Sequence, residues 1–257
     1  MDLYLSAKKV LITGSSKGIG SSIARTFLEE GADIAIVARG ENNLSILANE
    51  LKSEYGKDRC IHSVCDCSST RSLENLRDLL IDKWGRIDIV IANAGNGQST
   101  LDPIQTDKDW LESWNSNFET ALQTTRIFTD ALKRSKGNIL FISSIAGLEA
   151  FGAPVSYSTA KSAVIAFSKN IARKLASDIR VNVIAPGNIN FPGSTWDKKM
   201  QSDPDRIKSL IENTVPMNRF GTPEEIASAA AFLCSSRANF ITGSVLVIDG
   251  GQTIGIF

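Results

Sequence analysis

The sequence contains a single histidine, His62, among 257 residues. A Ser-His-Asp hydrolase would have to use this one side chain, and a metal site with several histidine ligands cannot be assembled. The motifs H-E-x-x-H, G-x-S-x-G and G-x-x-x-x-G-K-S/T are also absent. The sequence therefore gives no support to zinc-protease, serine-hydrolase or P-loop chemistry, and we predict no metal site.

Cysteine is also scarce, and its spacing does not indicate a metal motif. The four cysteines are Cys60, Cys65, Cys67 and Cys234, and no two of them form a C-x-x-C pair. Because there is no second cluster, they cannot complete a zinc site. We expect reduced, structural thiols, which are usual in cytoplasmic proteins.

The chain has no excess of either charge and no evident targeting segment. Lysine and arginine total 28, as do aspartate and glutamate, so the formal net charge is zero. A protein that binds nucleic acid or an anionic membrane through its charge would carry a basic surplus. Residues 1–6 lack the basic start and long apolar core of a signal peptide, and Glu149 and Pro154 interrupt the apolar stretch 139–155. We therefore expect a cytoplasmic protein that binds neither nucleic acid nor membrane.

What the sequence does contain is a regular alternation of short apolar runs and longer amphipathic segments. The apolar runs, rich in isoleucine and valine, are residues 10–12, 34–38, 61–64, 87–92, 139–143, 181–184 and 245–248. The amphipathic segments are residues 18–30, 42–55, 70–84, 114–134, 157–176 and 223–234. Strands that are apolar on both faces and separated by helices predict an α/β protein: a doubly wound Rossmann fold with a seven-stranded parallel sheet and helices on both faces.

No linker or internal repeat divides the chain, so we predict one domain over residues 1–257. Residues 186–216 hold four of the seven prolines and interrupt the alternation, and we expect this segment to be irregular. It follows the carboxyl end of a predicted strand, and in such folds ligands bind at the carboxyl ends of the strands. We therefore predict a substrate lid over about residues 187–216.

A glycine-rich segment, residues 13–20, follows the first predicted strand and precedes the first predicted helix. Its sequence, TGSSKGIG, has the spacing G-x-x-x-G-x-G. Glycines let the backbone turn tightly and approach a pyrophosphate, and the amino end of the following helix faces that negative charge. Asn93-Ala94-Gly95 ends the fourth strand, beside the point where the strand order reverses. Together the two segments predict a nucleotide site, although each alone is compatible with an ordinary turn.

Tyr157 and Lys161 lie four residues apart on a predicted helix and so share one face. A cation beside the phenol, together with a positively charged nicotinamide, is expected to lower the pKa of the tyrosine towards neutrality, as acid–base catalysis requires. Ser144 directly follows the predicted strand 139–143, from where its hydroxyl can polarise a carbonyl. A tyrosine and a lysine at this spacing also occur by chance on exposed helices, so the pattern alone leaves both interpretations open.

Taken together, these motifs resemble the classical short-chain dehydrogenase/reductase family over essentially the whole chain. The matching strings are residues 13–20, residues 93–95, Ser144 with Tyr157-x-x-x-Lys161, and Pro186-Gly187. Residues 219–226 (RFGTPEEI), Thr242-Gly243 and Asp249-Gly-Gly251 resemble the 3-oxoacyl-acyl-carrier-protein reductase branch. The resemblance also implies a homotetramer or homodimer, built partly through the helices at 114–134 and 157–176.

The resemblance implies a role for each matching position. Tyr157 would be the general acid that protonates the carbonyl oxygen as hydride arrives. Lys161 would hold the cofactor ribose and lower the pKa of Tyr157, Ser144 would orient the carbonyl, and Asn117 would hold a water for proton relay. The implied cofactor-binding positions are Gly14, Ser16, Gly18, Ile19, Gly20, Asn93, Ala94, Gly95, Tyr157 and Lys161, with Asp66 and Cys67 at the adenine and Pro186, Gly187 and Ile189 beside the nicotinamide.

One stretch departs from the family pattern. Three residues after Gly187 the family has a threonine that contacts the nicotinamide carboxamide, whereas this chain has Asn190. Asparagine also donates and accepts hydrogen bonds, so binding need not be lost. Residues 191–196 (FPGSTW) are also unlike the family, and we interpret both differences as signs of a specialised substrate.

Three charged residues bear on the choice between NAD and NADP. NAD enzymes place a carboxylate on the ribose 2′-hydroxyl, and NADP enzymes place a cation on the 2′-phosphate. Asp33 has the sequence spacing of that carboxylate, but it precedes the apolar run 34–38 and so lies at the far end of its strand. Arg39 follows the same run at the crevice end, and Lys17 supplies a second cation. We therefore predict NADP(H) bound by Lys17 and Arg39, with NAD(H) less favoured.

The sequence thus predicts an NADPH-dependent oxidoreductase that reduces a carbonyl of 3-oxoacyl, ketone or keto-sugar type to an alcohol. The alternative is an NAD-dependent dehydrogenase of a sugar, sterol or hydroxy acid, which Arg39 disfavours. A nucleotide-binding regulatory protein without turnover is a more distant alternative, because all four catalytic positions are filled. The identity of the small-molecule substrate does not follow from the sequence.

Overall fold

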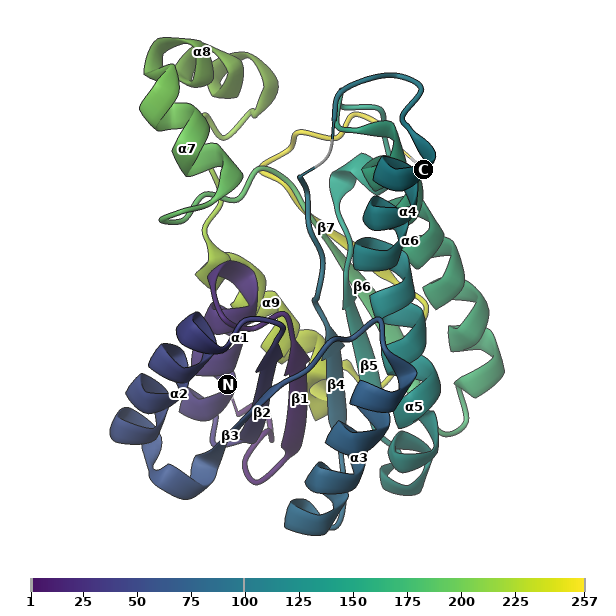
Figure 1. Cartoon of the computed structure of the whole chain (residues 1–257). Helices are drawn as coiled ribbons and strands as arrows, with labels where there is room; N and C mark the ends of the chain where they lie inside the picture. Colours follow the sequence, from purple (N-terminus) through teal and green to yellow (C-terminus); the bar gives the residue numbers. More distant parts are fainter. Residues whose placement is uncertain (1, 99, 257) are drawn as a thin grey trace.

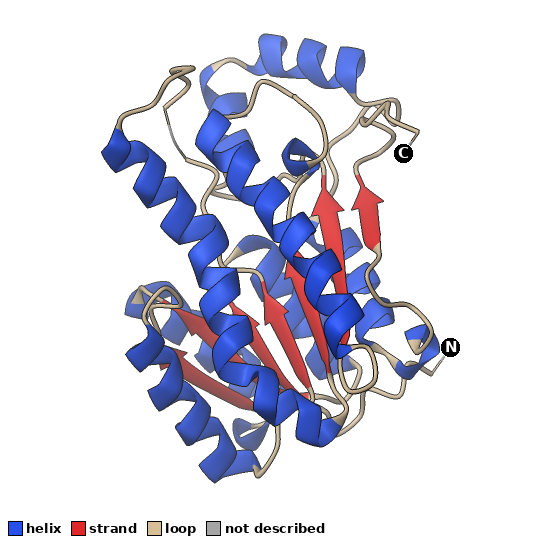
Figure 2. Ribbon diagram, turned by 90° about the vertical axis from the view of Figure 1, so that its right-hand side faces the viewer, coloured by secondary structure: helices blue, strands red, loops and turns tan. Residues whose placement is uncertain are grey.

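The computed structural model describes residues 2–98 and 100–256. Seven strands form one parallel sheet in the order β3-β2-β1-β4-β5-β6-β7. Figure 2 shows the strands pointing in the same direction, with helices on both faces. The strand order runs outward from β1 in one direction and from β4 in the other. This is the doubly wound Rossmann arrangement that the sequence predicts.

The strands coincide with the runs rich in isoleucine and valine because a central strand of such a sheet is covered on both faces. Their bounds are β1 Lys9–Thr13, β2 Asp33–Ala38, β3 Cys60–Val64, β4 Ile89–Ala92, β5 Asn138–Ile142, β6 Arg180–Pro186 and β7 Val245–Ile248. Every residue of β5 is buried. β1 pairs with β2 on one side and with β4 on the other, which brings the carboxyl ends of these three strands together.

Most of the helices coincide with the predicted amphipathic segments. Their bounds are α1 Gly18–Glu29, α2 Glu41–Tyr55, α3 Thr70–Trp84, α4 Asp107–Trp114, α5 Thr120–Ser135, α6 Val155–Leu175, α7 Thr195–Ser202, α8 Pro204–Thr214 and α9 Pro223–Cys234. The predicted helix 114–134 corresponds to α5 and the π-helical turn Asn115–Glu119 that precedes it, and the chain is already helical in α4 before position 114. In the described part of the chain, no helix is long and apolar enough to cross a membrane.

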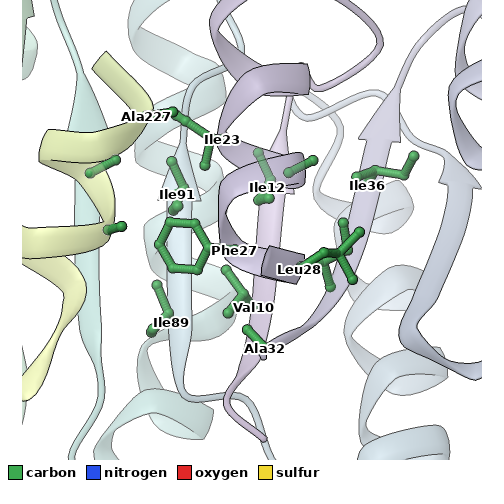
Figure 3. Close-up of a cluster of buried hydrophobic side chains, with 14 of the residues drawn as sticks. Val10, Ile12, Ile23, Phe27, Leu28, Ala32, Ile36, Ile89, Ile91 and Ala227 are labelled. Carbon is green, nitrogen blue, oxygen red and sulfur yellow. The ribbon is translucent and has the colours of Figure 1, made fainter. Parts of the chain in front are cut away.

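The sheet separates two apolar layers that hold the helices in place. Phe27 of α1 is fully buried among Val10, Ile89 and Ile91, on the face covered by α1, α2 and α9 (Figure 3). Phe128 of α5 is equally buried on the opposite face, which α3, α5 and α6 cover. Truncating a buried phenylalanine to alanine typically costs about 3–5 kcal/mol. The core therefore fixes the positions of the strand ends, from which the functional residues project.

The expectation that residues 186–216 are irregular is wrong, because the segment contains α7 and α8. These two helices stand apart from the layers that cover the sheet (Figure 1). Ser194 and Asp203 cap them by accepting hydrogen bonds from the backbone N–H groups of Asp197 and Arg206. Pro204 occupies the first turn of α8, where proline sacrifices no helical hydrogen bond. Part of the proline enrichment therefore marks a helix start rather than a loop.

Candidate active site

The glycine-rich segment turns at the carboxyl end of β1 and leads into α1. Gly14 has a φ of +63°, and a Cβ at this position would lie 2.7 Å from Cα of Ala94. Only glycine tolerates both conditions. The side-chain Nδ2 of Asn93 donates to the carbonyl oxygens of Thr13 and Gly14, both at 2.9 Å. The two predicted segments, 13–20 and 93–95, are therefore hydrogen-bonded into one unit.

A cavity of about 300 Å³ lies beside this turn, and the predicted catalytic residues meet there. Most of the residues that line it come from the glycine-rich turn, from the ends of β4, β5 and β6, and from α6. They include Asn117, Ser144, Tyr157 and Lys161, and the predicted cofactor residues Gly14, Lys17, Ile19, Gly20, Asn93, Gly95, Pro186, Gly187 and Ile189. The tertiary fold thus brings together side chains from more than 170 residues of sequence, between Gly14 and Ile189.

A second cavity of about 660 Å³ continues from the first along the glycine-rich turn. The predicted residues that line it are Gly14, Ser16, Lys17, Arg39, Asp66, Cys67, Ala94 and Gly95. Lys108 and Glu112 of α4 line it as well. Sequence reasoning missed both, because it placed the start of that helix at 114. Lys17, Arg39 and Lys108 give this cavity three cationic side chains.

Gly18 is the predicted cofactor residue that the structure places elsewhere. It lines neither of these two cavities, and the ring of Phe191 occupies the space into which a Cβ would project. Its φ of +59° also favours glycine. Gly18 therefore starts α1 and leaves room for Phe191, and its contact with the cofactor stays a prediction.

Tyr157 and Lys161 project from the same face of α6, as their spacing predicts. The Nζ atom of Lys161 lies 5.8 Å from the centre of the Tyr157 ring. Burial raises the pKa of Tyr157 above its ordinary value of 10.0, and a hydrogen bond with Ser144 opposes this rise. The protein by itself therefore does not lower the pKa of Tyr157 as expected from the neighbouring cation. At neutral pH the phenol carries its proton.

The ammonium group of Lys161 is directed to the backbone rather than to the phenol. Its Nζ donates to the carbonyl oxygen of Ile142 at 3.0 Å. Burial lowers the pKa of Lys161 from 10.5 to about 8, so the group remains mostly protonated at neutral pH. A Cβ on Gly95 would lie 3.1 Å from this Nζ and 2.9 Å from Oδ1 of Asn117. Lys161 and Asn117 therefore approach each other across Gly95.

Asn117 lies in the π-helical turn and is almost completely buried. Its Oδ1 accepts a hydrogen bond from the backbone N–H of Asn96 at 3.0 Å, and its Nδ2 donates to the carbonyl oxygen of Asn96 at 2.9 Å. The amide thereby holds both sides of one peptide segment. This contact fixes the loop after β4 over the first cavity.

The charged residues at the two ends of β2 lie in different surroundings, as the sequence predicts. Asp33 stands at the start of the strand, where its carboxylate pairs with Lys9 and Arg59, and it lines neither cavity. Arg39 follows the carboxyl end and lines the larger cavity. The carboxylate chosen by sequence spacing is therefore outside the larger cavity, whereas the arginine borders it.

A third cavity, of about 420 Å³, shares Ser144 and Tyr157 with the first and extends towards α7. Trp196 of α7 lines both cavities, and Lys199 is the one charged residue among those that line the third. Asn190 lines neither, because its Oδ1 accepts a hydrogen bond from the Ser194 hydroxyl at 2.8 Å and so supports the start of α7.

Comparisons with known proteins agree with this arrangement over nearly the whole chain. The family model described as Enoyl-(Acyl carrier protein) reductase matches residues 14–253. A tropinone reductase homolog of Arabidopsis thaliana is 37% identical, covering 98% of this chain and 94% of its own. A 3-oxoacyl-acyl-carrier-protein reductase of Chlamydia pneumoniae is 32% identical, covering 98% and 100%. The crystal structure of L-sorbose reductase from Gluconobacter frateurii, complexed with NADPH and L-sorbose, superimposes with a TM-score of 0.92 at 31% identity over 100% of both chains.

Proposed function

The chain belongs to the classical short-chain dehydrogenase/reductase family, and we propose that it reduces a ketone carbonyl of a small molecule to an alcohol with NADPH. The observation that carries this proposal is the convergence of Ser144, Tyr157 and Lys161 in a cavity bordered by the glycine-rich turn. A hydroxyl, a protonated phenol and a buried cation beside a dinucleotide-shaped space suit carbonyl reduction.

The two adjoining cavities fit NADP(H) in shape and in charge. Gly14 and Gly20 line the first cavity, and a Cβ on either would clash with neighbouring backbone atoms, so glycine is needed for the tight turn that borders the space for a pyrophosphate. Lys17, Arg39 and Lys108 offer cations for the 2′-phosphate, which NAD lacks. The similar L-sorbose reductase was solved with NADPH, in agreement with this choice.

Each residue of the site has a defined task in the proposed reaction. The reduced nicotinamide, when bound, supplies the hydride that the carbonyl carbon receives. Tyr157 donates its proton to the carbonyl oxygen, for which the raised pKa keeps the phenol protonated. Ser144 donates a hydrogen bond to the same oxygen, and the Lys161 ammonium holds the ribose hydroxyls and stabilises the phenolate left after proton transfer. Asn117 holds the loop that borders the reacting groups.

The segment 187–216 forms the lid of the substrate site in this proposal. Phe191 and Trp196 line both the first and the third cavity, so this segment contributes a wall to each. The Trp196 ring also contacts Phe220 at a centroid distance of 5.5 Å, which ties α7 to the segment before α9. An aromatic wall of this kind excludes water from the reacting carbonyl.

The proposal is tested by following NADPH consumption with a panel of small ketones, for the wild type and for Tyr157→Phe. Removal of the general acid should lower turnover by at least about a hundredfold. Binding of NADPH, measured by calorimetry, should stay within about threefold of the wild type, because the ring itself is retained. Turnover of Tyr157→Phe at the wild-type rate would refute the acid assignment. Binding of neither NADPH nor NADH by the wild type would refute the reductase itself.

A further inference from the structure

The third cavity combines the two reacting hydroxyls with an apolar wall. Ser144 and Tyr157, which the proposed reaction places at the carbonyl oxygen, line it. Most of the other side chains that line it are apolar, among them Leu101, Ile145, Phe151, Ile189, Trp196 and Leu210. Its volume of about 420 Å³ is typical of a small-molecule site, so it accommodates a substrate that extends beyond its carbonyl group.

The charged side chains of the first and third cavities are all cations. Lys17 and Lys161 line the first cavity, and Lys199 lines the third. Within the described part of the chain, neither cavity is lined by a carboxylate. The proposed function assigns Lys17 and Lys161 to the cofactor, so Lys199 is the cation left for the substrate. A site with this charge attracts an anionic group and repels a cationic one.

Lys199 is an exposed residue whose ammonium group lies beside the aromatic wall of the cavity. Its Nζ is 4.6 Å from the centre of the Trp196 ring, which is the distance of a cation–π contact. Trp196 lines both the first and the third cavity. The contact therefore holds the ammonium group near the substrate space while leaving it open to a ligand.

No carboxylate of the described residues forms an ion pair with Lys199. The acidic residues closest to it in the sequence have other partners. Asp197 accepts hydrogen bonds from the backbone N–H of Gly193 and from the side chain of Gln201, and Asp203 caps α8. The charge of Lys199 is therefore not neutralised within the folded chain.

Thr195 adds a second hydrogen-bond donor to the same face of α7. It precedes Lys199 by four residues, so the two side chains are neighbours on the helix, and it also lines the third cavity. Its hydroxyl makes no hydrogen bond with any other described residue. A carboxylate only accepts hydrogen bonds, so a hydroxyl and an ammonium group one turn apart suit its two oxygens.

We propose that Lys199, together with Thr195, binds a carboxylate of the substrate, so that the enzyme reduces keto acids in preference to neutral ketones of the same shape. This inference rests on the proposed carbonyl reduction. The ketone oxygen then lies at Ser144 and Tyr157, and the hydrocarbon between the two ends lies along the apolar wall. One cation matches the single charge of a carboxylate, whereas a phosphate monoester carries a charge between about −1.5 and −2.

The test compares keto acids with their neutral amides, which have nearly the same shape. Acetoacetate, 4-oxopentanoate and 5-oxohexanoate are each paired with the corresponding amide, because the span from Lys199 to the carbonyl site selects a chain length. For each compound kcat/KM is measured by NADPH consumption. The wild type should prefer the acid in at least one pair by about tenfold or more, through a charge-assisted hydrogen bond. This preference should fall as sodium chloride is added, because salt screens an accessible ion pair.

Variants on α7 separate the charge from other effects of the helix. Lys199→Met keeps the aliphatic stem and removes the charge, so the ratio of acid to amide should fall towards one, and Lys199→Glu should reverse the preference. Both should bind NADPH like the wild type, because Lys199 lines neither of the first two cavities. Thr195→Val should lower the ratio by a smaller factor. Lys198→Met is the matched control, since Lys198 is exposed, adjacent and outside the cavity, and it should keep the wild-type ratio.

Three results would overturn the inference and leave the reductase standing: an unchanged ratio in Lys199→Met, an equal loss in Lys198→Met, or a wild type that reduces the amides as well as the acids in all three pairs. An unchanged ratio in Thr195→Val would exclude Thr195 from the site. A wild type that reduces none of the six compounds also overturns the inference. The panel of small ketones used with Tyr157→Phe then decides separately whether the proposed function stands.

Discussion

Replacing Lys161 with methionine should change how the stability of the protein depends on pH. Burial lowers the pKa of Lys161 from 10.5 to about 8, which corresponds to about 3 kcal/mol of unfavourable free energy when the folded protein holds the proton. Loss of the hydrogen bond to Ile142 leaves a buried carbonyl oxygen unpaired and costs about 1–3 kcal/mol. At pH 7 the two effects oppose each other, so the free energy of unfolding of Lys161→Met should lie near or slightly above that of the wild type.

The pH dependence separates the two effects. Between pH 8 and 10.5 the unfolded wild type binds more protons than the folded protein, so its stability rises with pH in this window. The penalty is fully present below pH 8, falls as the pH rises through the folded pKa, and is gone above pH 10.5. Relative to Lys161→Met, the wild type should therefore gain about 2 kcal/mol between pH 7 and pH 10.

Urea denaturation of both proteins at a series of pH values, without cofactor, measures this difference directly. The hydrogen bond to Ile142 affects the offset between the two stability curves, whereas the buried ammonium affects their relative slope. Parallel curves would show that Lys161 is not desolvated in the folded protein. They would also contradict the assignment of Lys161 as a buried cation of the active site.

Two further predictions concern the cofactor site. Arg39→Asp should shift the preference from NADPH towards NADH by about 1–3 kcal/mol, the magnitude of a hydrogen bond to a charged group, as measured by calorimetry at fixed salt. The control Arg77→Asp, at a partly exposed position of α3 outside the cavity, should keep the NADPH preference, and a preference unchanged in Arg39→Asp would exclude Arg39 from the phosphate site. Gly95→Ala would place a methyl group 2.9 Å from Oδ1 of Asn117 and should cost about 1–3 kcal/mol of stability together with most of the turnover. Gly97→Ala, where the nearest atom lies at 3.9 Å, should be tolerated, and equal losses in both variants would refute the steric argument.

The parts of the fold that depend on residues close together in the sequence could be predicted from it. Runs of isoleucine and valine specify strands covered on both faces, and the spacing of Tyr157 and Lys161 places them on one helical face. The glycine at position 14 is required by the positive φ of its own turn. Because strand ends meet at one edge of a parallel sheet, the same pattern also predicts that residues 13–20 and 93–95 lie together.

Prediction of helices from the local sequence was wrong in two places. Prolines and glycines in 186–216 obscured α7 and α8, although Ser194 and Asp203 are ordinary helix caps. The predicted helix begins at 114, near the end of α4, although the chain is helical from Asp107 onward, so Lys108 is not among the predicted cofactor residues.

The sheet, the glycine-rich turn, the family and the candidate catalytic residues follow from the amino-acid sequence. The protonation of the site and the shape of its cavities depend instead on how the folded chain packs. The burial that raises the pKa of Tyr157 and lowers that of Lys161 comes from segments distant in the chain. The C-terminal segment is likewise fixed by a distant residue, since the Glu149 carboxylate accepts hydrogen bonds from the backbone N–H groups of Ile254 and Gly255. Desolvation and the pairing of buried polar groups depend on which residues pack around a side chain, and the sequence alone does not specify those residues.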